Sequence, residues 1–345
     1  MPANIPGRDP MNAVERVQYE VDIEEIEYLR HGDKPFIARV YRPRGHGPFP
    51  MLIEAHGGAW VRQDRMRNAM MDERIARSGV IVAGIEFRMP PADPAYPASV
   101  ADIHYAVRWF KSRAADFAGD PGRIGLIGTS SGGHQVMLVA MRPGDARYGV
   151  VPLPGSSVDA SVHFVIPCWP VIDPLGRYEK VKEEAAAGSK EALETIEAHD
   201  LYWKTEAAMD EGNPTRALER GEKLAMPPVL YIQGTADKAH PRAHRDRFVV
   251  AIAATVTGAI PKISLHSVDR LARLIGWVVR TIPGRRHKRV AANVDLALPA
   301  GKFPEELRER TKRETYRAFA SFALLALWSA GWKRETDNAR VTIEN

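Results

Sequence analysis

A serine at position 130 lies in the segment Gly-Thr-Ser-Ser-Gly at residues 128–132, which matches the pattern G-x-S-x-G. An apolar run at residues 124–127 precedes it and a helical pattern begins at His134, so the serine is expected at a sharp strand-to-helix turn. Such a turn projects the hydroxyl clear of the backbone, at the positive end of the helix dipole. Ser130 is therefore a candidate nucleophile. Because the pattern is short, the alternative is a glycine-rich turn without chemistry.

Two adjacent glycines follow an earlier apolar run at residues 51–55. Backbone N–H groups at such a turn can face a pocket and stabilise the oxyanion that forms from a carbonyl group during acyl transfer. The N–H groups of Gly57 and Gly58, together with that of Ser131 directly after the nucleophile, are predicted to form this oxyanion hole. A plain turn is the alternative.

An acidic residue, Asp237, follows a third apolar run at residues 228–233. The carboxyl end of a parallel strand is where α/β proteins build their sites. A carboxylate there can orient and stabilise the histidine that takes a proton from a serine. The alternative role is the N-cap of a helix that starts near Pro241. The chain order, serine before acid, favours the catalytic role.

The apolar runs that carry these residues predict the fold class. Residues 17–41 alternate apolar and polar side chains, as half-buried antiparallel strands do. Later runs are short, almost continuously apolar and rich in Val and Ile, which is typical of strands buried on both faces. Helical patterns separate them, so an α/β fold with a mostly parallel sheet is expected. The runs are residues 49–55, 80–87, 123–127, 162–167 and 228–233.

Two departures from this alternation predict the domain organisation. Residues 178–203 are charged, Ala-rich and helical, and they lie where a short connection between strands would suffice. We therefore expect cap segments, formed by the N-terminal residues and about residues 176–212, on an α/β core of residues 1–249. Residues 250–345 carry 17 Lys and Arg against 9 Asp and Glu. This basic region is expected to complete part of the core and to contain a helix at about residues 305–332.

Composition excludes several classes of protein. A chain of 345 residues, 45% of them hydrophobic, can bury a large core, so disorder and fibrous repeats are excluded for most of it. The single Cys168 cannot form an internal disulfide and fits a reducing compartment. We find neither a signal-like segment nor an apolar stretch long enough for a transmembrane helix, so a cytoplasmic protein is expected. The basic tail lacks a nucleic-acid-binding signature, so no nucleic-acid partner is expected.

The motifs, taken in order, resemble the hormone-sensitive-lipase-like carboxylesterases, a branch of the α/β-hydrolase fold. Residues 56–59 read His-Gly-Gly-Ala, like the oxyanion motif of that family, and the resemblance covers about residues 17–249. It implies a twisted, mostly parallel sheet flanked by helices and covered by a helical cap. It also implies a serine carboxylesterase that hydrolyses small-molecule esters of short to medium acyl chains through an acyl-enzyme and needs no cofactor.

The resemblance further implies a histidine about thirty residues after the acid, and here the sequence departs from the family. His266 has that distance from Asp237 but lies inside an apolar run, so a structural role is its alternative. His287 lies in a basic cluster that hinders its protonation. His240 and His244 follow the acid directly and have the i, i+4 spacing of metal ligands, but no third ligand accompanies them. His266 is the predicted base, and no metal is expected.

The departure leaves two further hypotheses open. The change in composition near Val249 and the absence of the expected turn around the base favour the hypothesis that the C-terminal region was replaced or frame-shifted. The other reading frames of the coding DNA would test this hypothesis. The alternative function is a hydrolase-like binding or interaction module that lacks its base. The apolar end of the C-terminal helix is expected to pack on the sheet, with a homodimer contact or a membrane surface as the alternatives. Aromatic residues near the motifs are predicted to line an apolar substrate pocket: Trp60, Trp169, Tyr202 and Trp203.

Overall fold

The computed structural model describes residues 18–91, 95–234, 236–257, 305–306, 309–311 and 341–344. The chain divides into two compact units, one of residues 1–244 with 338–345 and one of residues 245–337. The motifs described above all lie in the first unit. His266 and His287 lie outside the described residues, as does most of the helix expected at residues 305–332.

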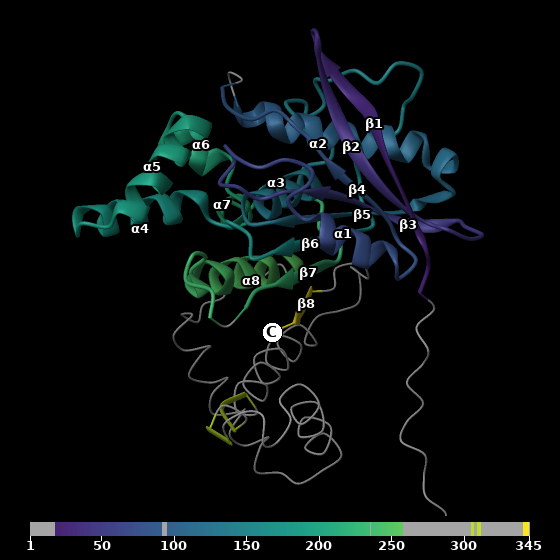
Figure 1. The fold of residues 1–345 in the computed structure, drawn as a ribbon. Helices are drawn as coiled ribbons and strands as arrows, with labels where there is room; N and C mark the ends of the chain where they lie inside the picture. Colours follow the sequence, from purple (N-terminus) through teal and green to yellow (C-terminus); the bar gives the residue numbers. More distant parts are fainter. Residues whose placement is uncertain are drawn as a thin grey trace, which may run out of the picture. The chain divides into compact units, whose positions relative to one another are not determined.

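An eight-stranded sheet in the order β1-β2-β4-β3-β5-β6-β7-β8 runs through the first unit (Figure 1). β1 and β2 are antiparallel, β2 pairs antiparallel with β4, and all further pairs are parallel. The predicted antiparallel opening and mostly parallel sheet are confirmed. The strands are β1 (Val21–His31), β2 (Lys34–Pro43), β3 (Phe49–Ala55), β4 (Ile81–Ile85), β5 (Gly119–Thr129), β6 (Phe164–Cys168), β7 (Val229–Ile232) and β8 (Val341–Glu344).

Helices connect these strands, and in the described part of the chain a short 3-10 helix precedes β5. Several helices begin at a residue whose side chain accepts a hydrogen bond from the first turn, as Asp173 does for α4 and Asn213 for α7. The helices are α1 (Ala69–Ala76), α2 (Ala95–Ser112), α3 (Ser131–Met141), α4 (Pro174–Ala186), α5 (Lys190–Trp203), α6 (Glu206–Glu211), α7 (Pro214–Glu219) and α8 (Arg242–Thr257), with the 3-10 helix η1 at Ala114–Phe117. None of the helices in the described part of the chain is both long and apolar enough to cross a membrane.

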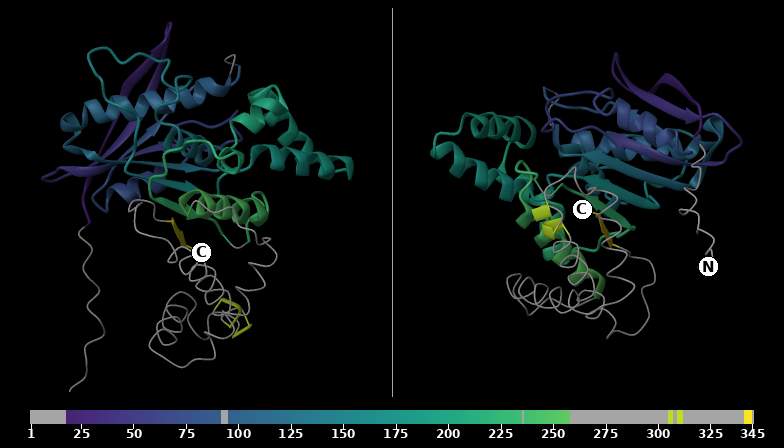
Figure 2. Two further views of the ribbon diagram at one scale, coloured as in Figure 1. Left: turned by 180° about the vertical axis from the view of Figure 1, so that it is seen from behind. Right: turned by 60° about the horizontal axis from the view of Figure 1, so that its bottom comes forward.

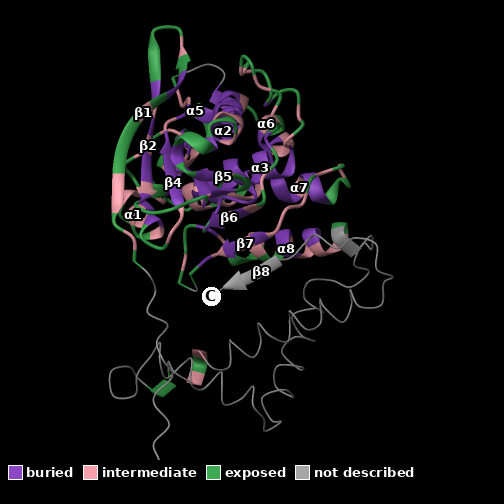
Figure 3. Cartoon of the chain, turned by 90° about the vertical axis from the view of Figure 1, so that its right-hand side faces the viewer, coloured by how far each residue is buried: buried purple, intermediate pink, exposed green. Residues whose placement is uncertain are grey.

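The helices cover both faces of the sheet. α1 packs against β2 and β4, whereas α2 and α3 lie on the opposite face and contact β3 and β5 (Figures 1 and 2). Every residue of α3 is buried, and the central strands are buried on both faces (Figure 3). The continuous apolar runs of the sequence reflect this double burial.

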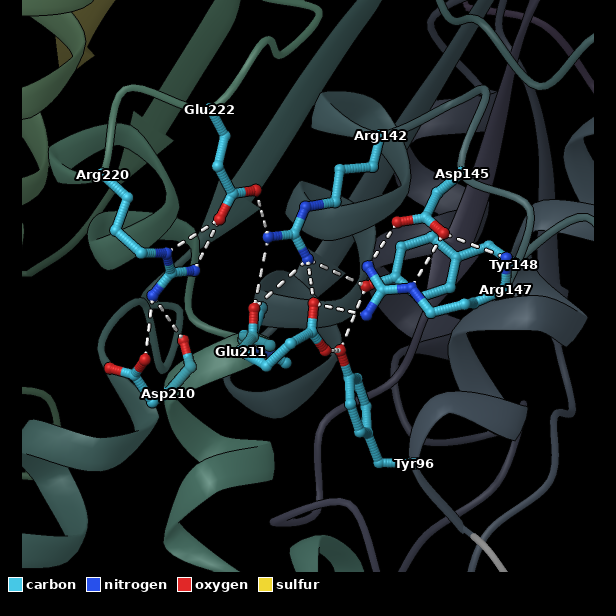
Figure 4. Close-up of polar contacts among 11 residues, drawn as sticks. Tyr96, Arg142, Asp145, Arg147, Tyr148, Asp210, Glu211, Arg220 and Glu222 are labelled. Carbon is cyan, nitrogen blue, oxygen red and sulfur yellow. Dashed lines mark hydrogen bonds and ion pairs between the residues drawn. The ribbon is translucent and has the colours of Figure 1, made fainter.

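Helices α4, α5 and α6 pack on one another in the segment where a cap is expected (Figure 2). The last residue of α6, Glu211, accepts hydrogen bonds from Arg142 at 2.8 Å and from Tyr96, and it pairs with Arg147 at 2.6 Å (Figure 4). Arg142 follows α3 and also pairs with Glu222 at 2.6 Å. Because the Arg142 side chain is only 6% exposed, its guanidinium is shielded from water, and its charge-assisted bonds to Glu211 anchor the end of α6 to the core.

Candidate active site

Ser130 stands at the turn between β5 and α3, as the sequence predicts. Its φ of 53° and ψ of −117° form a backbone conformation that non-glycine residues rarely adopt. A Cβ at Gly132 would lie 2.0 Å from the carbonyl oxygen of Ala55, so only glycine admits this close approach of the helix to β3. The half-buried Ser130 side chain is thus held at the carboxyl end of the central strand β5.

Two backbone hydrogen bonds fasten this turn to the segment that follows β6. The N–H of Ser130 donates to the carbonyl oxygen of Cys168 at 2.9 Å, and the N–H of Val171 donates to that of Ser130 at 3.1 Å. The strained conformation is therefore supported on both sides of the serine.

His240 and Asp237 complete a hydrogen-bonded row with the serine. Nε2 of His240 lies 3.0 Å from Oγ of Ser130, and Nδ1 of His240 lies 3.0 Å from Oδ2 of Asp237. The loop is braced internally, because Oδ1 of Asp237 accepts the backbone N–H of Ala239 at 3.0 Å and Gln233 donates to the carbonyl oxygen of His240 at 2.6 Å. This is the arrangement in which a histidine can take a proton from a serine.

The structure joins Ser130 and Asp237, both predicted from the sequence, through His240. The sequence preferred His266 as the base, and that residue lies outside the described residues. His240 entered that reasoning only as a weaker candidate with metal-ligand spacing. Among the described residues, no group of three His, Cys, Asp or Glu side chains could hold a metal ion. The position of His240 in the loop directly after the acid was the available signal.

The electrostatics suit a neutral base. Burial lowers the pKa of His240 below its ordinary value, and the nearby Arg177 cation lowers it further, while Asp237 opposes both effects. With Nδ1–H donating to the Asp237 carboxylate, Nε2 carries the lone pair that faces Ser130; this tautomer follows from the hydrogen-bond partners.

The glycine turn after β3 lies beside the serine. A Cβ at Gly57 would lie 3.2 Å from Cβ of Ser130. The Gly57 N–H donates to the Thr129 hydroxyl at 3.0 Å. That N–H is paired and unavailable to an oxyanion, so the predicted role of Gly57 does not hold in this structure.

The next two residues turn their backbone with positive φ, 117° at Gly58 and 52° at Ala59. Within the described part of the chain, neither of their N–H groups has a hydrogen-bond acceptor. Ser131 begins α3, where N–H groups have no partner inside the helix. Three N–H groups near the serine are therefore available, and Ala59 is one that sequence reasoning missed.

Three of the four aromatic residues that were predicted to line a substrate pocket are buried in the protein interior. The Trp60 ring stacks on Tyr202 with centroids 5.3 Å apart and meets Trp203 edge-on at 5.6 Å. All three are buried, so they belong to the packing between α5 and the core rather than to an open pocket. Trp169 is 38% exposed and remains a candidate substrate contact.

Comparison with known proteins identifies the family. A family model described as BD-FAE matches residues 39–250, more than half of the chain. The chain belongs to the BD-FAE family.

Curated relatives of this BD-FAE-family protein are ester hydrolases. Carboxylic ester hydrolase LipN of Mycobacterium tuberculosis is 38% identical over 141 residues, which are 40% of this chain and 37% of LipN. Versiconal hemiacetal acetate esterase of Dothistroma septosporum is 28% identical over 296 residues, which are 77% of this chain and 81% of that protein. The chain spans only 29 to 54% of LipN, LipM and LipC, the first curated relatives.

Among solved structures, an inhibited esterase B from Lactobacillus rhamnosis is 25% identical, with a TM-score of 0.53 over 70% of this chain and 75% of that one. The α/β-hydrolase fold and the resemblance to hormone-sensitive-lipase-like esterases are confirmed.

Proposed function

We propose that this protein is a serine carboxylesterase. The observation that carries the proposal is the row of hydrogen bonds from Ser130 through His240 to Asp237. The esterase names of its relatives support the same reaction class.

In the proposed reaction, Oγ of Ser130 attacks the ester carbonyl carbon while His240 takes the hydroxyl proton. The C–O bond to the alcohol breaks, the alcohol leaves with the proton from His240, and an acyl-enzyme remains. Water then gives a proton to His240 and attacks the acyl carbon, and the carboxylic acid leaves as Ser130 regains its proton. Asp237 holds the imidazole in the required tautomer and stabilises its protonated form.

The oxyanion is stabilised by the free N–H groups of Gly58, Ala59 and Ser131. In this set of donors Ala59 takes the place of Gly57, which the sequence predicted, since the N–H of Gly57 donates to the Thr129 hydroxyl. Such donors act strongly because they are oriented before the reaction begins.

For the substrate, we propose esters of short to medium acyl chains, of about two to eight carbons. The closed packing of Trp60, Tyr202 and Trp203 leaves Trp169 as the aromatic contact available to such a chain. Turnover of p-nitrophenyl esters of increasing length measures this preference, and a preference for long-chain triglycerides would contradict it.

Ser130→Ala tests the nucleophile. It is expected to lower turnover of p-nitrophenyl butyrate by at least roughly a thousandfold, because only binding and the oxyanion hole remain. It should also abolish labelling by a fluorophosphonate probe. Ser112→Ala, at the exposed end of α2, is the matched control and should change neither. Absence of labelling and turnover in the unaltered protein would favour the alternative of a non-catalytic binding module.

A further inference from the structure

An open groove of about 590 Å³ lies along helix α1 and the turn before it. Side chains from residues 67–78 line it, and neither the candidate catalytic residues nor the proposed oxyanion donors are among them. Most of these side chains are three or four positions apart, a spacing that places them on one face of a helix. The volume is in the range of small-molecule sites, roughly 300 to 1,000 Å³. The groove is therefore a second place where a ligand could bind.

Three apolar side chains form part of the groove lining: Met70, Met71 and Ile75. Met71 and Ile75 are half-buried and pack against the core cluster that includes Val82 of β4, so they are held in place from below. Met70 is 71% exposed, more than any other large apolar side chain in the described part of the chain. An apolar ligand in the groove would remove this surface from water, and methionine adapts readily to such a ligand.

The neutral polar groups of the groove already have partners. Asn68 donates its side-chain N–H groups to Glu54 at 2.7 Å and to Thr129 at 3.0 Å. The hydroxyl of Ser78 donates to the carbonyl oxygen of Ile75 at 2.6 Å. These side chains have no further N–H or O–H to offer, so a polar ligand group would have to find its donors elsewhere in the lining.

Two exposed arginines, Arg67 and Arg74, supply such donors. Within the described residues, neither guanidinium forms a hydrogen bond or an ion pair. The two carboxylates of α1 do not neutralise them, because Glu73 pairs with Arg77 at 2.6 Å and Asp72 is buried. The groove thus combines an apolar lining with two cations that have no counter-charge.

We propose that this groove binds a carboxylate carried on a single unbranched apolar chain, that is, a medium-chain fatty acid. The chain covers Met70, Met71 and Ile75, and the carboxylate accepts N–H donors from Arg67 or Arg74, whose guanidinium groups match a carboxylate in geometry and charge. An apolar lining of three side chains suits one alkyl chain. The site is separate from Ser130, so this inference does not depend on the proposed esterase function.

The test is calorimetric titration of the protein with octanoate at pH 8, where the acid is ionised and dissolved as monomers. The unaltered protein is expected to bind it. Butyrate has the same charge with less apolar surface, and octan-1-ol has the chain without the charge. Each is expected to bind at least roughly tenfold more weakly than octanoate, because each loses one of the two contributions.

Variants at exposed positions separate the two contributions without disturbing the core. Arg67→Gln combined with Arg74→Gln should weaken octanoate binding by roughly tenfold and leave octan-1-ol binding unchanged. Met70→Gln should weaken the binding of both. Arg62→Gln is the matched control, because Arg62 is also exposed and lies in the same segment but does not line the groove.

Three results would overturn the inference. Equal affinity for octanoate in the unaltered protein and the double arginine variant would place the acid at another site, the acyl site of the esterase included. Absence of octanoate binding would do the same. Binding to phosphatidylglycerol vesicles that depends on Arg67 and Arg74, without binding of octanoate, would assign this face to a membrane surface instead.

Discussion

The backbone N–H of Gly57 donates a 3.0 Å hydrogen bond to the hydroxyl of Thr129, the residue directly before Ser130. Asn68 donates to the same oxygen at 3.0 Å and to Glu54 at 2.7 Å. The glycine turn after β3 and the serine turn after β5 are thus joined through one hydroxyl. This oxygen fixes where the free N–H groups of the glycine turn lie relative to the nucleophile.

Thr129→Val removes that acceptor while keeping the size and branching of the side chain. We expect kcat for a short ester to fall roughly tenfold with little change in KM, because the N–H donors are no longer held against the serine. Thr129→Ser keeps the hydroxyl and is the matched control. Equal kinetics for the valine and serine variants would show that this hydrogen bond does not position the oxyanion donors.

His240→Gln should lower kcat/KM by at least roughly a thousandfold, since no other side chain in the row can accept the serine proton. His244→Gln, four residues further on, is expected to be nearly silent. His266→Gln decides the sequence-based prediction: if it abolishes acylation and His240→Gln does not, His266 is the base. Thermal unfolding of each variant separates a kinetic loss from a loss of folded protein.

The pH profile follows from the pKa of His240. The base acts in its neutral form, so kcat/KM should fall as the pH drops through this pKa, and the midpoint should lie below 6.5 because burial and Arg177 both lower it. Arg177→Gln removes the cation and should move the midpoint upward. A midpoint above 6.5 in the unaltered protein would contradict this assignment.

Glu54 on β3 and Asp72 on α1 form a buried acidic pair that predicts alkaline sensitivity. Burial raises the pKa of Glu54 to about 7, and burial with the charge of Glu54 raises that of Asp72 to about 9. The folded state thus holds protons that the unfolded chain releases above about pH 4, so stability should fall as the pH rises from there to about 9.

Asp72→Asn removes the ionisable group at nearly constant volume. The free energy of unfolding at pH 8 should rise by roughly 2 kcal/mol relative to the unaltered protein, and the gain should shrink as the pH falls to about 4 and below, where the carboxyl groups become protonated in the unfolded chain as well. Urea unfolding at several pH values measures this. A gain of the same size at every pH would point to packing instead of charge.

Local features of the sequence determined the sheet and the two glycine-containing turns. Continuous apolar runs mark strands that are buried on both faces, and glycines on either side of a serine at a strand-to-helix boundary admit a turn too crowded for a side chain at those positions. Ser130 and the turn at Gly58 were therefore predictable, because the residues that constrain each turn are close to it in the chain.

Only the tertiary structure decided which groups meet. Ser130 and His240 are 110 residues apart, and their contact depends on how the loop after β7 folds back over the end of β5. The hydroxyl of Thr129 accepts the N–H of Gly57, and Nη1 of Arg177 is buried without a hydrogen-bond acceptor. Hydrogen bonds and ion pairs extend only a few ångströms, so their partners follow from packing in space rather than from spacing along the chain.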